Sequence, residues 1–290
     1  MPDSQTMVRD DPTRFAAQTA WIAANAVGLN IRMVVHLGDI VNTGATIAQW
    51  VSADSAWDTL DTANIPYQLA LGNHDDDENC WWATREVGNY NTYFGQGRYT
   101  GQDWWAGGFF EEAHAENAYN LFTAGGKDYI LITLEVYPRA EALAWASGLL
   151  TTYADREAII VTHNYMYTDD TRQHDPEDDY GPDDLFIGGT DGEGVWSALA
   201  GHDNIVLILS GHQLGDGTGI LMSYQRSNSA WQILSNYQGG VTDGDDASLR
   251  IMTIKPSTAQ IDIKTYSVDD SAYRTEADQQ YTLNYRYRSV

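Results

Sequence analysis

The chain has 290 residues, of which 43% are hydrophobic, a composition that is sufficient for a large buried core. Acidic residues outnumber basic ones by 41 to 16, and at a formal net charge of -25 we expect long nucleic acid and anionic membranes to be repelled. No apolar run reaches about 18 residues, which argues against a membrane span. The single cysteine excludes an internal disulfide bond.

The first part of the chain alternates between segments of helical and of extended periodicity. Pro12 is a favourable first residue of a helix, and Asn30 is a favourable stop. Residues 1–5 are too few to predict an element. The elements predicted here are helices over residues 12–29 and 47–63 and strands over residues 31–37 and 66–71.

Residues 76–125 break this alternation and are predicted to form a long, partly ordered insertion. The segment is rich in glycine and has no steady period, and a loop of this length is unusual unless it is functional. Two interpretations remain open: an aromatic mini-core that packs on itself, or a lid or stacking platform beside an active site. The aromatic residues are Trp81, Trp82, Tyr90, Tyr93, Phe94, Tyr99, Trp104, Trp105, Phe109, Phe110 and Tyr119.

Regular elements return after the insertion and become strands alone after Gly211. We find no internal repeat and no linker, so we predict one domain over residues 1–290, with residues 249–290 as C-terminal strands and a surface tail. The alternation predicts an α/β class, a layered sandwich. The elements predicted here are strands over residues 129–136, 157–162, 205–210, 229–236, 249–255 and 260–267, and helices over residues 139–153 and 194–200.

Four apolar runs lead into residues that can bind a metal ion, namely Asp39, Asn73, His163 and His212. Because ligand sites in open α/β sheets form beyond the carboxyl ends of strands, we expect these four side chains to meet. Carboxylate, amide oxygen and imidazole suit borderline divalent cations such as Mn, Fe, Co or Zn. No thiolate is present among them, which disfavours a structural zinc cage.

The two oxygens of Asp39 would allow it to bridge two cations, which could clamp a phosphoryl group and activate water. Asp3 and Gln5 would then add oxygens for the second cation. Asp39 is therefore the residue on which the catalytic interpretation depends.

The motifs Asp3-x-Gln5, Gly38-Asp39, Gly72-Asn73-His74-Asp75, His163 and Gly211-His212 resemble those of the calcineurin-like metallophosphoesterase superfamily in order, type and spacing. The branch would be one with an Asp-x-Gln first motif and an incomplete Gly-His-x-His motif. The resemblance implies an α/β/β/α sandwich of two mixed sheets. It also implies one or two divalent metal ions, with Mn, Fe, Zn, Co and Ni left open.

The resemblance also implies a role for each motif residue. A metal-bound hydroxide would attack phosphorus in line, and His74 would protonate the leaving oxygen or stabilise the transition state, with Asp75 beside it. The implied metal ligands are Asp3 and Gln5 for one cation, Asp39 as the bridge, and Asn73, His163 and His212 for the other.

Three positions depart from the family pattern. Gln5 stands where a histidine is usual, and Leu214 replaces the second histidine of Gly-His-x-His, so the first cation would lack a ligand or borrow one such as Asp216. Asn42 replaces the aspartate that orients the catalytic histidine, so either Asp75 takes over this role or the role is lost. Only two residues precede Asp3, which would normally close a strand, so we expect either that the sequence begins within a motif or that this central strand is missing.

The function predicted on these grounds is metal-dependent hydrolysis of a small phosphoester. Phosphodiesters are preferred because monoesters carry more charge and need more cationic side chains than this chain offers. The alternatives are a catalytically weakened metal- or ligand-binding domain, and a phosphomonoesterase or other ester hydrolase. Asn164, Tyr165 and Arg172 are candidates for substrate binding. Oligomeric state stays open, as does localisation, either secreted or periplasmic with an upstream signal or cytoplasmic.

Overall fold

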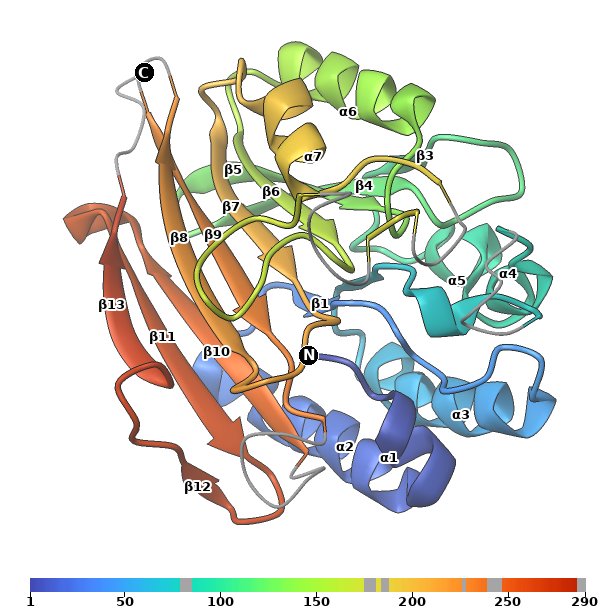
Figure 1. Cartoon of the computed structure of the whole chain (residues 1–290). Helices are drawn as coiled ribbons and strands as arrows, with labels where there is room; N and C mark the ends of the chain where they lie inside the picture. Colours follow the sequence, from blue (N-terminus) through green and yellow to red (C-terminus); the bar gives the residue numbers. More distant parts are fainter. Residues whose placement is uncertain (79–84, 175–180, 184–187, 226–227, 239–246, 286–290) are drawn as a thin grey trace.

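The computed structural model describes residues 1–78, 85–174, 181–183, 188–225, 228–238 and 247–285 (Figure 1). These residues build an α/β/β/α sandwich: a seven-stranded mixed sheet faces two smaller sheets, and helices cover the outer faces of the large sheet and of the smaller parallel pair. The predicted fold class is confirmed. No helix of the described part of the chain is long and apolar enough to cross a membrane.

The seven-stranded sheet has the strand order β3-β4-β5-β6-β7-β9-β8. Its centre, β5-β6-β7-β9, is parallel, and the flanking strands are antiparallel. Along β5, Ile130 and Ile132 face helices α6 and α7, whereas Leu131 faces the other sheet layer. The bounds are β3 Gly108–Phe109, β4 Ala118–Ala124, β5 Lys127–Leu134, β6 Glu157–Thr162, β7 Ile205–Ser210, β8 Thr218–Tyr224, β9 Ser229–Ser235, α6 Ala140–Thr152 and α7 Gly192–Leu199.

The second layer consists of two separate sheets: a parallel pair, β1 and β2, and an antiparallel group of four strands, β10 to β13. A cavity of about 310 Å³ lies between β1 and β10, lined mainly by apolar side chains such as Val35, Leu209 and Leu249. The described residues lining it include none of the predicted metal ligands. The bounds are β1 Val34–His36, β2 Tyr67–Leu69, β10 Ser248–Lys255, β11 Gln260–Ser267, β12 Ala272–Tyr273, β13 Gln280–Asn284, and the 3-10 helix η2 Pro256–Thr258.

The first residues of the chain are ordered along β1. The Leu37 amide donates to the carbonyl of Met1 at 3.0 Å, and the Ser4 amide donates to the carbonyl of Asp39 at 3.1 Å. Asp3 is thereby held beside the loop that carries Asp39. A short helix, α1 (Gln5–Asp10), follows; it was not predicted.

Helices α2 (Pro12–Leu29) and α3 (Ile47–Thr62) lie where helices were predicted, and they cover the outer face of β1 and β2. The Asp11 side chain accepts a hydrogen bond from the Thr13 amide at the start of α2, which satisfies one of its unpaired donors. Asn30 ends α2 in the left-handed conformation that a stop residue commonly adopts.

The predicted insertion is more regular than expected. It contains α4 (Gly88–Phe94) and α5 (Gln96–Tyr99), and its last residues form strand β4 of the large sheet. Tyr90 and Phe94 are buried against Trp50 of α3, with ring centroids 6.4 and 6.1 Å from it. These contacts join this part of the insertion to the main core rather than to other residues of the insertion. Trp81 and Trp82 lie outside the described residues.

Three further strands differ from prediction. Residues 218–224 form β8, an edge strand for which no element was predicted. Part of the predicted surface tail forms β12 and β13, which both pair with β11. Residues 286–290 of that tail lie outside the described part of the chain.

Candidate metal centre

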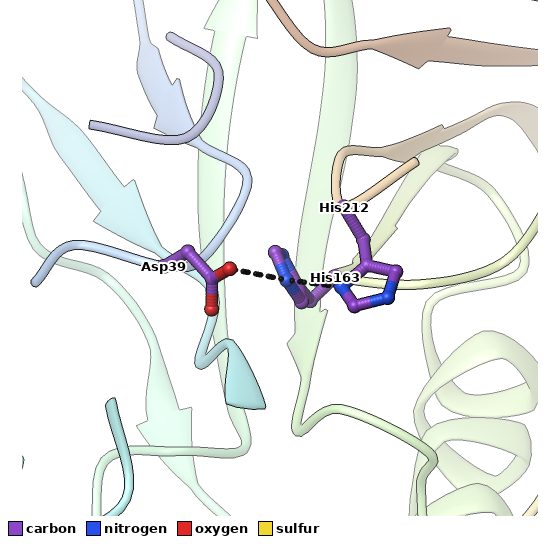
Figure 2. A group of neighbouring side chains, drawn as sticks. All are labelled: Asp39, His163 and His212. Atoms are coloured by element: carbon purple, nitrogen blue, oxygen red, sulfur yellow. Dashed lines mark hydrogen bonds and ion pairs between the residues drawn. The ribbon is translucent and has the colours of Figure 1, made fainter. Parts of the chain in front are cut away.

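Asp39, His163 and His212 meet at the carboxyl ends of β1, β6 and β7, as predicted (Figure 2). One ligand atom from each lies within 4.8 Å of the others. The Nε2 atom of His163 is 3.2 Å from Asp39 Oδ2 and 3.1 Å from His212 Nδ1. His163 Nδ1 donates to the Leu37 carbonyl at 2.8 Å, which directs Nε2 toward the other two side chains.

The backbone conformation around these residues allows their loops to pack closely together. Asp39 and His212 both have left-handed backbone, with φ of 52° and 66°. Such conformations cost free energy and are retained where the surrounding structure imposes them, commonly at functional sites. Gly38, with φ of 102°, lies so close to the His163 ring that a Cβ would be 2.5 Å from Nδ1.

Gly72 leaves room for the Asp39 carboxylate, since a Cβ at Gly72 would lie 2.1 Å from Asp39 Oδ1. We therefore expect Gly72→Ala to displace that carboxylate, to destabilise the fold by about 1–3 kcal/mol, and to weaken Mn²⁺ binding. Chemical denaturation and calorimetric titration with Mn²⁺ measure the two effects. Gly28→Ala in α2 is the control, because a Cβ there meets nothing within 4 Å. Equal stability and Mn²⁺ affinity in Gly72→Ala would contradict the expectation.

The Gly-Asn-His-Asp motif forms a 3-10 turn, η1 (Asn73–Asp75), after β2. The backbone amide of His74 donates to Asp39 Oδ1 at 2.9 Å. His74 Nδ1 donates to the backbone carbonyl of Asn42 at 2.8 Å, so Asn42 orients this ring through its main chain. The carboxylate of Asp75 accepts hydrogen bonds from the amides of Val41 and Gly72 at 3.1 and 2.9 Å, contacts that hold the two loops together.

Asp3 and Gln5 lie next to Asp39 and His212. Gln5 Nε2 donates to Asp39 Oδ2 at 3.0 Å. Asp3 Oδ2 accepts hydrogen bonds from the His212 amide at 2.9 Å and from Asn236 Nδ2 at 3.0 Å. Both residues are buried, and these contacts link Asp3 and Gln5 to the cluster of Asp39, His163 and His212.

The electrostatics of the cluster favour positive charge at its centre. Burial opposes a charge on Asp39, but His163 and His74 outweigh it and hold the pKa of Asp39 below its usual range. Burial likewise opposes a charge on His163, yet Asp39 and Asp3 raise the pKa of His163 to about 9. Burial, reinforced by His163, lowers the pKa of His212 to about 3. A cation here would displace the His163 proton.

Buried oxygen atoms without hydrogen-bond partners are a second reason why these side chains fit a divalent cation. Several buried oxygens at the centre have no hydrogen-bond partner among the described residues, although such atoms are normally satisfied. They belong to carboxylate and amide groups, which are metal ligands. They are Asp3 Oδ1, Gln5 Oε1, Asn73 Oδ1 and Gln238 Oε1.

The three predicted substrate-binding residues are hydrogen-bonded to other side chains of the protein. Tyr165 is buried in the core under α7, and its hydroxyl donates to Gln232 Oε1 at 2.7 Å. The guanidinium of Arg172 contacts Glu193 and Gln232, each at 2.7 Å. Asn164 is buried and donates to the Tyr137 hydroxyl at 2.5 Å. These contacts give Tyr165 and Arg172 a structural setting between strands and α7.

The positions around the incomplete Gly-His-x-His motif do not supply the missing ligand. Leu214 is 54% exposed and apolar. Asp216, the expected substitute, is exposed and accepts a hydrogen bond from the Thr218 amide at 3.1 Å. Instead, Asn236 and Gln238 contact Asp3. They were not predicted, although they too follow an apolar strand, β9.

A family model described as calcineurin-like phosphoesterase matches residues 11–216, more than half of the chain. The chain therefore belongs to the calcineurin-like phosphoesterase family, as the motifs predicted. The family implies divalent metal ions, and Asp39, His163 and His212 form the candidate site. The matched segment includes these residues and leaves Asp3 and Gln5 outside it.

Among curated proteins, the chain is 29% identical over 289 residues to "Uncharacterized protein YvnB" of Bacillus subtilis (strain 168), covering 94% of this chain. It spans 20% of the length of that relative. Two solved structures are similar, each over 93% of this chain and 48% of the other chain. They are a 5'-nucleotidase precursor from Thermus thermophilus, with 11% identity and a TM-score of 0.44, and the Haemophilus influenzae NAD nucleotidase, with 12% identity and a TM-score of 0.41.

Proposed function

We propose that this chain hydrolyses small phosphoesters, with phosphodiesters preferred over monoesters, by means of divalent cations held at the candidate metal centre. The observation that supports this most strongly is the convergence of Asp39, His163 and His212 within 4.8 Å, in a chain of the calcineurin-like phosphoesterase family. The proposed ligands are Asp3 and Gln5 on one side, Asp39 as the bridge, and Asn73, His163 and His212 on the other.

The cations, when bound, would neutralise charge on the phosphoryl oxygens and activate water. Asp39 contacts residues of both proposed ligand groups, because its Oδ2 atom lies 3.0 Å from Gln5 Nε2 and 3.2 Å from His163 Nε2. The buried carboxylate is thus held in place before a substrate binds. A site that is fixed before the substrate arrives stabilises the transition state with little reorganisation.

His74 is the proposed general acid. Its Nδ1 is committed to the Asn42 carbonyl, so Nε2 is the nitrogen that would pass a proton to the leaving oxygen. The amide of His74 is bonded to Asp39 Oδ1, which ties the proton donor to the bridging carboxylate. In this proposal Asp75 positions His74 by holding its loop to Val41 and Gly72.

The preference for diesters rests on charge. A monoester dianion needs more cationic partners than a diester monoanion. Arg9, the arginine that contacts Asn42, is paired with Asp10, and Arg172 is paired with Glu193. With a net charge of -25, a small substrate is expected rather than long nucleic acid.

The test is hydrolysis of a chromogenic phosphodiester, a phosphomonoester and a carboxylate ester by the purified chain, loaded separately with Mn²⁺ or Zn²⁺. We expect turnover of the phosphodiester to be fastest and to disappear with a chelator. Bound metal without hydrolysis of any ester would instead identify a catalytically weakened metal-binding domain. Faster turnover of the monoester or the carboxylate ester would overturn the substrate preference.

A further inference from the structure

The two sides of the proposed metal centre have unequal ligand sets, and this inference rests on the function proposed above. Asn73, His163 and His212 serve one cation together with Asp39. Asp3 and Gln5 serve the other, and the position where the family has a further histidine holds the exposed Leu214. The Asp3 side is therefore one ligand short.

Gln238 lies beside Asp3. Its side chain is buried, and its Nε2 is 3.3 Å from Asp3 Oδ2. Its Oε1 is also buried and has no hydrogen-bond partner among the described residues. A buried amide oxygen that is left unsatisfied costs free energy, and a cation held by Asp3 would satisfy it.

Asn236 holds Gln238 in place, and both the oxygen and the nitrogen of its side-chain amide make hydrogen bonds. Its Oδ1 accepts the Gln238 amide at 3.1 Å, and its Nδ2 donates at 3.0 Å both to Asp3 Oδ2 and to the His212 carbonyl. Both residues follow β9, which runs parallel to β7, the strand that precedes His212. The same sheet edge therefore delivers Gln238 and His212.

We propose that Gln238 is a metal ligand, supplying its amide oxygen to the cation on the Asp3 side in place of the histidine that Leu214 replaces. The ligands of that cation would be Asp3, Gln5, Asp39 and Gln238, all through oxygen. An all-oxygen set favours a harder cation such as Mn²⁺, whereas the imidazoles on the other side also suit Zn²⁺. Mn²⁺ is therefore the appropriate probe.

The test measures Mn²⁺ stoichiometry by elemental analysis and titration calorimetry, together with the electron paramagnetic resonance signal of coupled Mn²⁺ pairs. Gln238→Leu is expected to lower the content from about two cations per chain to about one and to abolish the coupled signal. Gln238→Glu is the discriminating variant. Its carboxylate can bind a cation but cannot donate to Asp3, so it keeps two cations if residue 238 is a ligand and loses one if the residue only holds Asp3.

Gln68→Leu is the matched control, because Gln68 is also a buried glutamine with an unpartnered Oε1, but its Nε2 contacts β4 and β5. It should retain two cations. A Gln238→Leu chain that still binds two, or a Gln238→Glu chain that binds one, would overturn the ligand role while leaving the proposed function intact. A wild-type chain that binds neither Mn²⁺ nor Zn²⁺ would instead refute the proposed function, and this inference with it.

Discussion

Asp39→Ala is expected to lose both bound cations and to lower phosphoesterase activity by at least roughly 10²-fold. The buried carboxylate contacts Gln5 Nε2 at 3.0 Å, His163 Nε2 at 3.2 Å and the His74 amide at 2.9 Å. Its removal leaves neither side of the centre with a bridging oxygen. Metal content by elemental analysis and turnover of a chromogenic phosphodiester measure the two losses.

Two companion variants separate metal binding from folding. Asp39→Asn keeps the side-chain shape and one oxygen but removes the negative charge, so it should fold while binding metal weakly. Asp216→Ala removes an exposed carboxylate close in sequence to His212, and it should keep both metal and activity. Two cations per chain in Asp39→Ala would show that the centre lies elsewhere.

His74→Ala is expected to lower kcat by roughly 10²–10⁴-fold while the cations stay bound. The ring is held by the Asn42 carbonyl and its own amide by Asp39, so the side chain can be removed without removing a proposed ligand. The measurement is kcat together with metal content for the same preparation. A substrate with a better leaving group should recover part of the loss, because it depends less on protonation.

The control for His74 is His114→Ala, which removes an exposed histidine paired with Glu116. It should leave kcat unchanged. Loss of metal in His74→Ala would identify His74 as a ligand or a structural residue, and an unchanged kcat would exclude it as the general acid.

The elements that the sequence predicted well are those with a strong local pattern. Strands β6 and β7 are continuous apolar runs buried on both faces, and their observed bounds equal the predicted ones. Helix α1 has only six residues, too few to establish a period. Strand β4 lies among aromatic residues and glycines, and its extended form comes from pairing with β5, which is a tertiary contact.

The residues of the candidate site likewise divide into those that local sequence predicts and those that it does not. Asp39, His163 and His212 were predictable because each follows an apolar run and belongs to a motif. Gln238 follows a strand too, but no motif marks it. Its significance comes from its distance to Asp3, a residue 235 positions earlier in the chain. Local sequence cannot carry that information, because it depends on how the sheets assemble.

Asp3 connects distant parts of the chain through hydrogen bonds. Its carboxylate is bonded to residues 209, 233 and 235 positions later, and closing loops of that length costs conformational entropy. Cations that bind only when these segments have come together would draw the equilibrium toward the assembled chain. If the proposed cations bind, a chelator is therefore expected to lower the free energy of unfolding of the chain as well as its activity, which chemical denaturation with and without the chelator measures.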